Sequence, residues 1–133
     1  MTDTPHKGKI LLVDDDKFLV DMYSMKFTQE GYDVTACLSV DDAVEALKGG
    51  FMPNAVLFDI VMPVNDGFAF LQMMRDQKLA TDAIKIALTN QGDEIEQKKA
   101  TELGASRYII KATMIPSEVV NIVGEEISKR AAH

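Results

Sequence analysis

The sequence predicts an α/β fold in which a five-stranded parallel sheet carries helices on both faces. Five short apolar segments alternate along the chain with five segments of helical character, which is typical of parallel strands joined by right-handed crossovers. The apolar segments are hydrophobic on both faces, as strands buried in a parallel sheet are. A chain of 133 residues forms one domain and is large enough to bury a substantial core.

The first half of the chain contains two predicted strands and two predicted helices. In the first helix Phe18, Met22 and Met25 recur at helical spacing, and Gly31 follows as a stop. Ser39 precedes the second helix and is suited to cap it. These elements are strands over 9–13 and 33–37 and helices over 17–30 and 40–48.

The second half contains three further strands and three further helices. A buried strand is indicated by the run NAVLFD, which is too short for a typical helix and ends in Asp59. Asp66 is expected to cap the next helix, Gly104 to stop the fourth, and Pro116 to open the last. These elements are strands over 54–58, 85–88 and 107–110 and helices over 66–77, 93–103 and 116–129.

Acidic residues follow two of the strands, and a lysine follows a third. Among doubly wound sheets the flavodoxin-like strand order 2-1-3-4-5 suits five strands best, and it would bring Asp14 and Asp15 beside Asp59. Three carboxylates this close repel one another, and a divalent cation with oxygen ligands, best Mg²⁺, resolves the conflict. Lys111 and Thr89 would complete a pocket of phosphoryl size, with Asp59 as the nucleophile.

Composition excludes several other classes of function. The net charge of −7 argues against nucleic-acid binding, which needs a basic face. The single cysteine, Cys37, cannot form an internal disulfide, and its place in an apolar strand predicts a small buried side chain. No apolar run reaches the length of a membrane span, and the N-terminus MTDTPHKGK is not a secretory signal. We therefore expect a cytoplasmic protein with no nucleic-acid or membrane partner.

Four motifs in this order resemble the receiver domain of two-component response regulators, the CheY-like superfamily. The motifs are the acidic pair in ILLVDDD, the aspartate in FDIVMPVNDG, the threonine in IALTN and the lysine in SRYIIK. The resemblance implies a receiver domain over 9–130, a short polar N-terminal extension over 1–8 and a tail over 131–133. No output domain is visible in the sequence.

The resemblance also implies which residues carry the chemistry. Asp59 would be the phosphoacceptor, taking a phosphoryl group from a phosphohistidine of a sensor kinase or a histidine phosphotransfer protein. Asp14 and Asp15 would hold Mg²⁺ together with Asp59 and the backbone carbonyl of Val61, and Mn²⁺ could substitute. Beyond self-phosphorylation from a phosphodonor and slow autodephosphorylation, no enzyme activity is expected.

Three further residues are implied in signalling. Thr89 and Lys111 would contact the phosphoryl oxygens, and Tyr108 would turn in behind Thr89. This would rearrange the face made by the fourth helix, fifth strand and fifth helix, which a downstream target, a fused output domain or a second copy in a phosphorylation-dependent dimer would read. The family commonly has proline after the lysine with a cis bond; here Ala112 follows, so the sequence leaves that geometry open.

Two functions of other classes stay open at this stage. The spacing Asp14-x-Asp16 after a strand also suggests a small Mg-dependent phosphatase of the haloacid dehalogenase type, with Asp14 as nucleophile. The run DDDKF lacks the threonine expected next in such enzymes, and the chain is short for one. The other alternative is a phosphorylation-independent, flavodoxin-like interaction module. Replacement of Asp59 by asparagine separates the three, because only a receiver loses its labelling.

Overall fold

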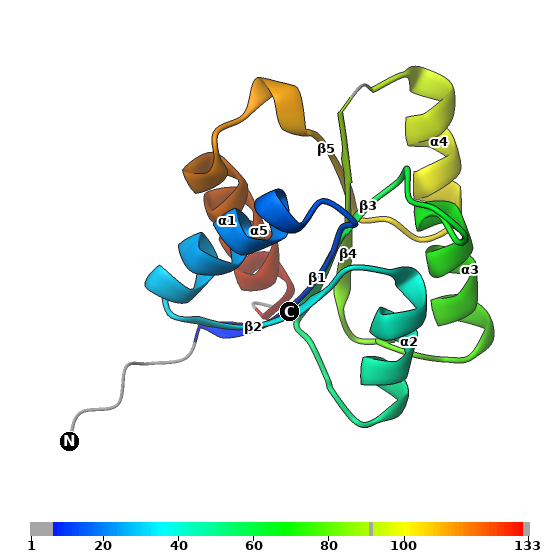
Figure 1. The fold of residues 1–133 in the computed structure, drawn as a ribbon, viewed down its shortest axis with the longest axis horizontal. Coiled ribbons are helices and arrows are strands. Elements are labelled where there is room, and N and C mark those ends of the chain that lie inside the picture. The colour runs from blue at the N-terminus through cyan, green and yellow to red at the C-terminus, as the bar shows by residue number, and fades with distance from the viewer. Residues whose placement is uncertain (1–6, 91, 132–133) are drawn as a thin grey trace.

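The computed structural model describes residues 7–90 and 92–131, and in this part of the chain five parallel strands form one sheet in the order β2-β1-β3-β4-β5 (Figure 1). The predicted α/β fold and strand order are therefore confirmed. The strands are β1 (Gly8–Val13), β2 (Tyr32–Cys37), β3 (Ala55–Asp59), β4 (Ile84–Thr89) and β5 (Arg107–Ile110). The helices are α1 (Lys17–Gln29), α2 (Val40–Lys48), α3 (Gly67–Asp76), α4 (Glu94–Glu102) and α5 (Pro116–Ala131), with a short 3₁₀ helix, η1 (Lys111–Thr113).

Helices cover both faces of the sheet, α1 and α5 one face and α2, α3 and α4 the other (Figure 1). In β1 the side chains alternate between the two resulting cores. Ile10 and Leu12 pack with α1 and α5, whereas Leu11 and Val13 pack with α2 and α3. All four are fully buried, which explains why this strand reads as one continuous apolar run. Cys37 is buried as well, as predicted.

The helix α1 forms where predicted, but its buried face is not the one that the methionine spacing marks. Phe18 and Met25 are 75% and 61% exposed, and the buried residues of α1 are Val20, Tyr23 and Phe27. Both sets recur at intervals of three and four residues, so periodicity alone cannot choose between them. The buried set packs into the core shared with β1, β2 and α5, where the ring of Tyr32 meets Phe27 edge to face at 5.6 Å.

The remaining differences from the predicted elements lie at their ends. The strand β1 begins at Gly8 and α5 reaches Ala131, two residues that the predicted extension and tail had included. Residues 1–6 and 132–133 lie outside the described part, so most of the extension and tail does too. After β5 the chain enters η1, and no cis peptide occurs among the described residues, so the Lys111–Ala112 bond is trans. None of the helices in residues 7–90 and 92–131 has both the length and the apolar character needed to cross a bilayer.

Candidate functional site

The predicted site residues meet at the carboxyl edge of the sheet because neighbouring strands are in register there. Val13 of β1 pairs with Phe58 of β3, so the next residues, Asp14 and Asp59, leave the sheet side by side. The strands β4 and β5 end at the same edge, where Thr89 pairs with Ile110. Four chain segments far apart in the sequence thus deliver their terminal side chains to one place.

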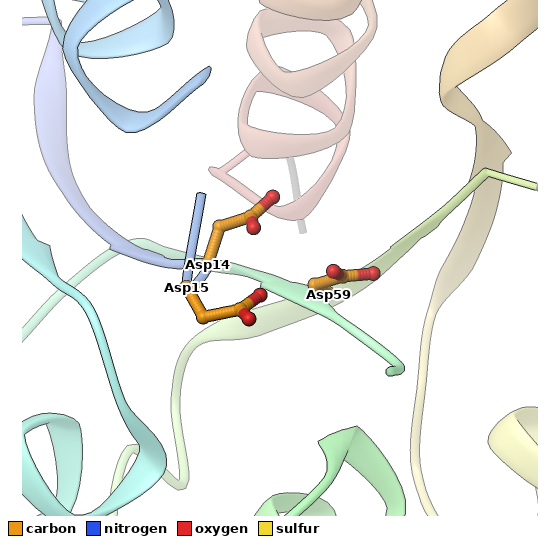
Figure 2. Close-up of side chains that lie close together, drawn as sticks. All are labelled: Asp14, Asp15 and Asp59. Atoms are coloured by element: carbon orange, nitrogen blue, oxygen red, sulfur yellow. The ribbon is translucent and has the colours of Figure 1, made fainter. Parts of the chain in front are cut away.

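Three carboxylates form an acidic cluster at this edge (Figure 2). One carboxylate oxygen each of Asp14, Asp15 and Asp59 lies within 4.8 Å of the others, as the strand order predicts. Asp14 and Asp59 are 1% and 6% exposed, whereas Asp15 lies open to solvent. Carboxylate oxygens alone, partly open to water, are the donor set that suits Mg²⁺. The structure does not test the carbonyl ligand predicted at Val61.

Lys111 supplies the positive charge of the cluster. Its Nζ donates a hydrogen bond to Asp14 Oδ2 at 3.0 Å and lies 3.6 Å from Asp59 Oδ2. Burial by itself would lower the pKa of Lys111, but the hydrogen bond and charge of Asp14, with the charge of Asp59, raise it above its ordinary value. Lys111 therefore stays charged, yet one ammonium group faces three carboxylates. The pocket keeps an excess of negative charge that fits a divalent cation.

Asp59 is the acid whose ionisation is most strongly opposed. Burial raises the pKa of Asp59 from 3.8 to about 6, against the charge of Lys111, and the Asp14 carboxylate adds to the rise. Hydrogen bonds from the backbone N–H groups of Val61 and Ile60 pull it back down. An uncompensated charge at Asp59 therefore costs folding free energy.

This cost predicts how stability depends on pH in the absence of divalent cations. The pKa of Asp59 is higher in the folded than in the unfolded chain, so protonation of Asp59 favours the folded state. This contribution to the free energy of unfolding is fully present below about pH 4 and is lost as the pH rises through about 6. We expect Asp59→Asn to match the wild type near pH 4 and to exceed it at pH 7, by roughly 2 kcal/mol in the free energy of unfolding. Urea denaturation in EDTA across this range measures the difference, and Mg²⁺ should restore the wild type. If the free energies of unfolding of the two proteins changed with pH in the same way, the raised pKa would not belong to Asp59.

Thr89 and Tyr108 lie on β4 and β5, the two strands that follow β3 in the sheet. Thr89 is buried at the end of β4, and Tyr108 is half-buried. The Tyr108 hydroxyl donates a short hydrogen bond to the carboxylate of Glu96 in α4. Burial, followed by this bond and the charge of Glu96, raises the pKa of Tyr108 to about 12, while hydrogen bonds from the Thr89 hydroxyl and the Asp93 N–H lower it.

Glu96 is the residue that sequence reasoning missed. It stands three residues after Asp93, the N-cap of α4, whose side chain accepts from the Glu96 N–H at 2.6 Å. This spacing predicts a capping box, in which the glutamate turns back toward the cap. The Glu96 side chain instead reaches Tyr108, and no local pattern could have indicated a partner twelve residues away.

A doubly wound sheet with an acidic cluster and a buried lysine at its carboxyl edge defines the class of protein, a flavodoxin-like domain with an acidic site at the ends of its strands. The chain belongs to the response regulator receiver domain family, whose model matches residues 10–123. The resemblance seen in the sequence motifs is therefore confirmed at the level of the family.

Solved structures share this fold. A CheY-like receiver domain protein from Methanospirillum hungatei JF-1 superposes with a TM-score of 0.84 at 24% identity, covering 93% of this chain and 96% of that one. The BeF3-activated receiver domain of DrrB gives 0.77 at 24% identity, covering 92% and 97%. The response regulator DrrB, a Thermotoga maritima OmpR/PhoB homolog, gives 0.79 at 25% identity, and the match covers 91% of this chain but 52% of DrrB.

Proposed function

We propose that this chain is a signalling receiver that accepts a phosphoryl group on Asp59 in a Mg²⁺-dependent reaction. The observation that carries the proposal is the position of Asp59 Oδ2, 3.6 Å from the Lys111 ammonium and beside two further carboxylates. An oxygen of the Asp59 carboxylate attacks phosphorus, and the bond from phosphorus to the donor histidine nitrogen breaks. The imidazole leaves with the electron pair of that bond, and its nitrogen then takes up a proton.

The residues around Asp59 would bind the cation and stabilise the charge of the phosphoryl group. Asp14 and Asp15, with Asp59 and the Val61 carbonyl, would hold Mg²⁺ or Mn²⁺, which neutralises charge on the transferring group when bound. Lys111 is already charged and within reach, so it can move its contact from Asp14 to a phosphoryl oxygen. Such contacts act on the developing charge, and the buried position of Lys111 strengthens them.

Phosphorylation would be read at the face made by α4, β5 and α5. Thr89 would turn toward the phosphoryl group and Tyr108 would follow it, so the new contacts favour a second arrangement of this face. The proposed phosphodonor is a histidine kinase or a histidine phosphotransfer protein. The proposed readers are a downstream target, a fused output domain or a second copy of the chain, in a cytoplasmic setting.

The structure argues against the phosphatase alternative, because both acids that it needs are engaged elsewhere. Asp14 accepts from Lys111 at one oxygen and from the Asp16 N–H at the other, 3.0 Å in each case. Asp16 turns away from the pocket and caps α1, accepting from the N–H groups of Phe18 and Leu19. A nucleophile at Asp14 with a proton donor at Asp16 is therefore disfavoured.

The test is treatment with acetyl phosphate and Mg²⁺, followed by intact-mass measurement. We expect the wild type to gain the mass of one phosphoryl group and Asp59→Asn to gain none. EDTA should suppress the gain, because the acidic cluster needs the cation. Asp16→Asn is the matched control, an acid lost at the same edge of the sheet but outside the pocket, and it should label like the wild type. Equal labelling of the wild type and Asp59→Asn would contradict the proposal.

A further inference from the structure

The helix α4 is the most weakly packed helix among those whose side chains are fully described. Ala100 is its one buried residue, whereas α3 buries four. Toward its C-terminal end it is held by exposed contacts, including Lys99 Nζ at 4.4 Å from the centre of the Phe68 ring. At its first turn the contact is the hydrogen bond between Glu96 and Tyr108. An element held by so few buried groups is one whose position a single contact can bias.

This contact is part of a chain of hydroxyl groups that leads back to the pocket. The Tyr108 hydroxyl gives its single proton to the Glu96 carboxylate, so its oxygen can only accept from other groups. Hydrogen bonding by the Thr89 hydroxyl and the Asp93 N–H lowers the pKa of Tyr108, so both groups lie near the Tyr108 oxygen. Thr89 ends β4, where it pairs with Ile110 of β5, two residues beyond Tyr108.

Steric contact ties the Tyr108 ring to the same loop. Gly92, just before α4, lies so close that a Cβ there would stand 2.7 Å from Ile110 Cδ1 and 3.2 Å from Tyr108 Cε1. The Tyr108 ring therefore lies close to the segment that leads into α4. Tyr108 thus meets this part of the chain at two places, with its ring near Gly92 and its hydroxyl at Glu96.

We propose that Glu96 is a positioning residue that holds Tyr108, and through it Thr89, in the arrangement of the unphosphorylated chain. The inference rests on the proposed function and extends it, because it names the group that sets how readily the α4 face responds. In the proposed phosphorylated state Thr89 turns toward the phosphoryl group and Tyr108 follows it, and Glu96 opposes this movement by fixing the Tyr108 hydroxyl. Loss of the Glu96 carboxylate removes that opposition and favours the phosphorylated arrangement.

Beryllium trifluoride with Mg²⁺ is the probe for the test, as a stable mimic of the phosphoryl group. Its affinity is measured for the wild type, Glu96→Ala and Glu96→Gln from the fluorine NMR resonance of bound beryllium trifluoride, a readout that does not depend on Tyr108. We expect Glu96→Ala to bind the probe about fivefold more tightly, the worth of one charge-assisted hydrogen bond at a half-exposed site. Glu96→Gln, which keeps an acceptor, should fall between the two.

Glu94→Ala is the matched control, because Glu94 lies in the same first turn of α4 and has the same effect on the helix dipole. It should bind the probe as the wild type does. Repeating the substitutions in Tyr108→Phe separates positioning from a general effect on α4. Without the tyrosine hydroxyl, Glu96→Ala should change the affinity no more than Glu94→Ala does.

The outcomes distinguish the inference from the function on which it rests. If the wild type bound no beryllium trifluoride at saturating Mg²⁺, the proposed function itself would fail. If the wild type bound it and Glu96→Ala behaved like Glu94→Ala, the function would stand and the role of Glu96 would be wrong. Weaker binding by Glu96→Ala, or an undiminished effect in Tyr108→Phe, would overturn the inference as well. Thermal melting of every variant shows whether each is folded.

Discussion

Lys111→Ala is expected to lower the free energy of unfolding by about 3 kcal/mol, because it leaves buried carboxylates without their counter-charge. The Lys111 side chain is only 6% exposed and its ammonium group contacts both Asp14 and Asp59, so little water is at hand to replace it. Removal of one partner of such a buried pair costs far more than the pair itself contributes. Urea denaturation at pH 7 in EDTA measures the loss. Part of it should return on adding Mg²⁺, since a cation in the acidic cluster takes over the charge balance.

Lys17→Ala is the matched control for this prediction. Lys17 forms an ion pair with Asp21 at 2.9 Å, nearly the distance found at Lys111, but its side chain is 72% exposed. Its loss should cost less than about 1 kcal/mol and should not respond to Mg²⁺. Equal costs for the two variants would mean that burial of the Lys111 pair has no energetic weight.

Gly67→Ala should have a second large effect, about 3 kcal/mol of destabilisation together with a displaced Asp59. A Cβ at Gly67 would stand 2.6 Å from the Asp59 carbonyl oxygen and 2.9 Å from Ile60 Cα. Both are backbone atoms, so no side chain can turn aside. The Gly67 N–H also donates to the Ile60 carbonyl at 2.8 Å, which fixes the start of α3 against the end of β3. The added methyl group must push the two apart.

The measurements are urea denaturation and the rate of labelling by acetyl phosphate. Gly49→Ala is the control, because a Cβ there would meet its nearest neighbour, the Glu45 carbonyl oxygen, at 3.3 Å, at a helix end that can adjust. It should change the free energy of unfolding by less than about 0.5 kcal/mol and leave labelling unchanged. If Gly67→Ala were as stable and as quickly labelled as Gly49→Ala, the segment between β3 and α3 would accommodate the methyl group without loss of free energy, and the prediction would be wrong.

Much of the fold and of the candidate site could be predicted because an apolar run followed by a charged residue marks where a buried strand ends. An apolar run that ends in Asp59 fixes both a buried strand and the edge at which the acid emerges, and the same holds for Asp14 and Lys111. Parallel strands put all their carboxyl ends at one edge, so topology alone brings these residues together. The order of the strands is not written in the sequence, and it was predicted as the doubly wound order that suits five strands best, which the structure confirms.

The features that could not be predicted depend on contacts between segments. The buried face of α1 is set by its packing against β1, β2 and α5, and the partner of Glu96 lies on β5. The close approach of Gly67 to Asp59 could not be predicted either, because the pair Asp66-Gly67 is typical of any turn that leads into a capped helix. Each is set by distances across the fold, which one-dimensional periodicity does not encode.

The strand β5 joins the edge of the sheet last in chain order, yet it brings Tyr108 and leads directly into Lys111. A nascent chain that has emerged only as far as β4 already holds the three acids but lacks the cation that reconciles them. Under the proposed function, such a partial chain should not be labelled on Asp59, because the lysine that contacts both Asp14 and Asp59 is still missing.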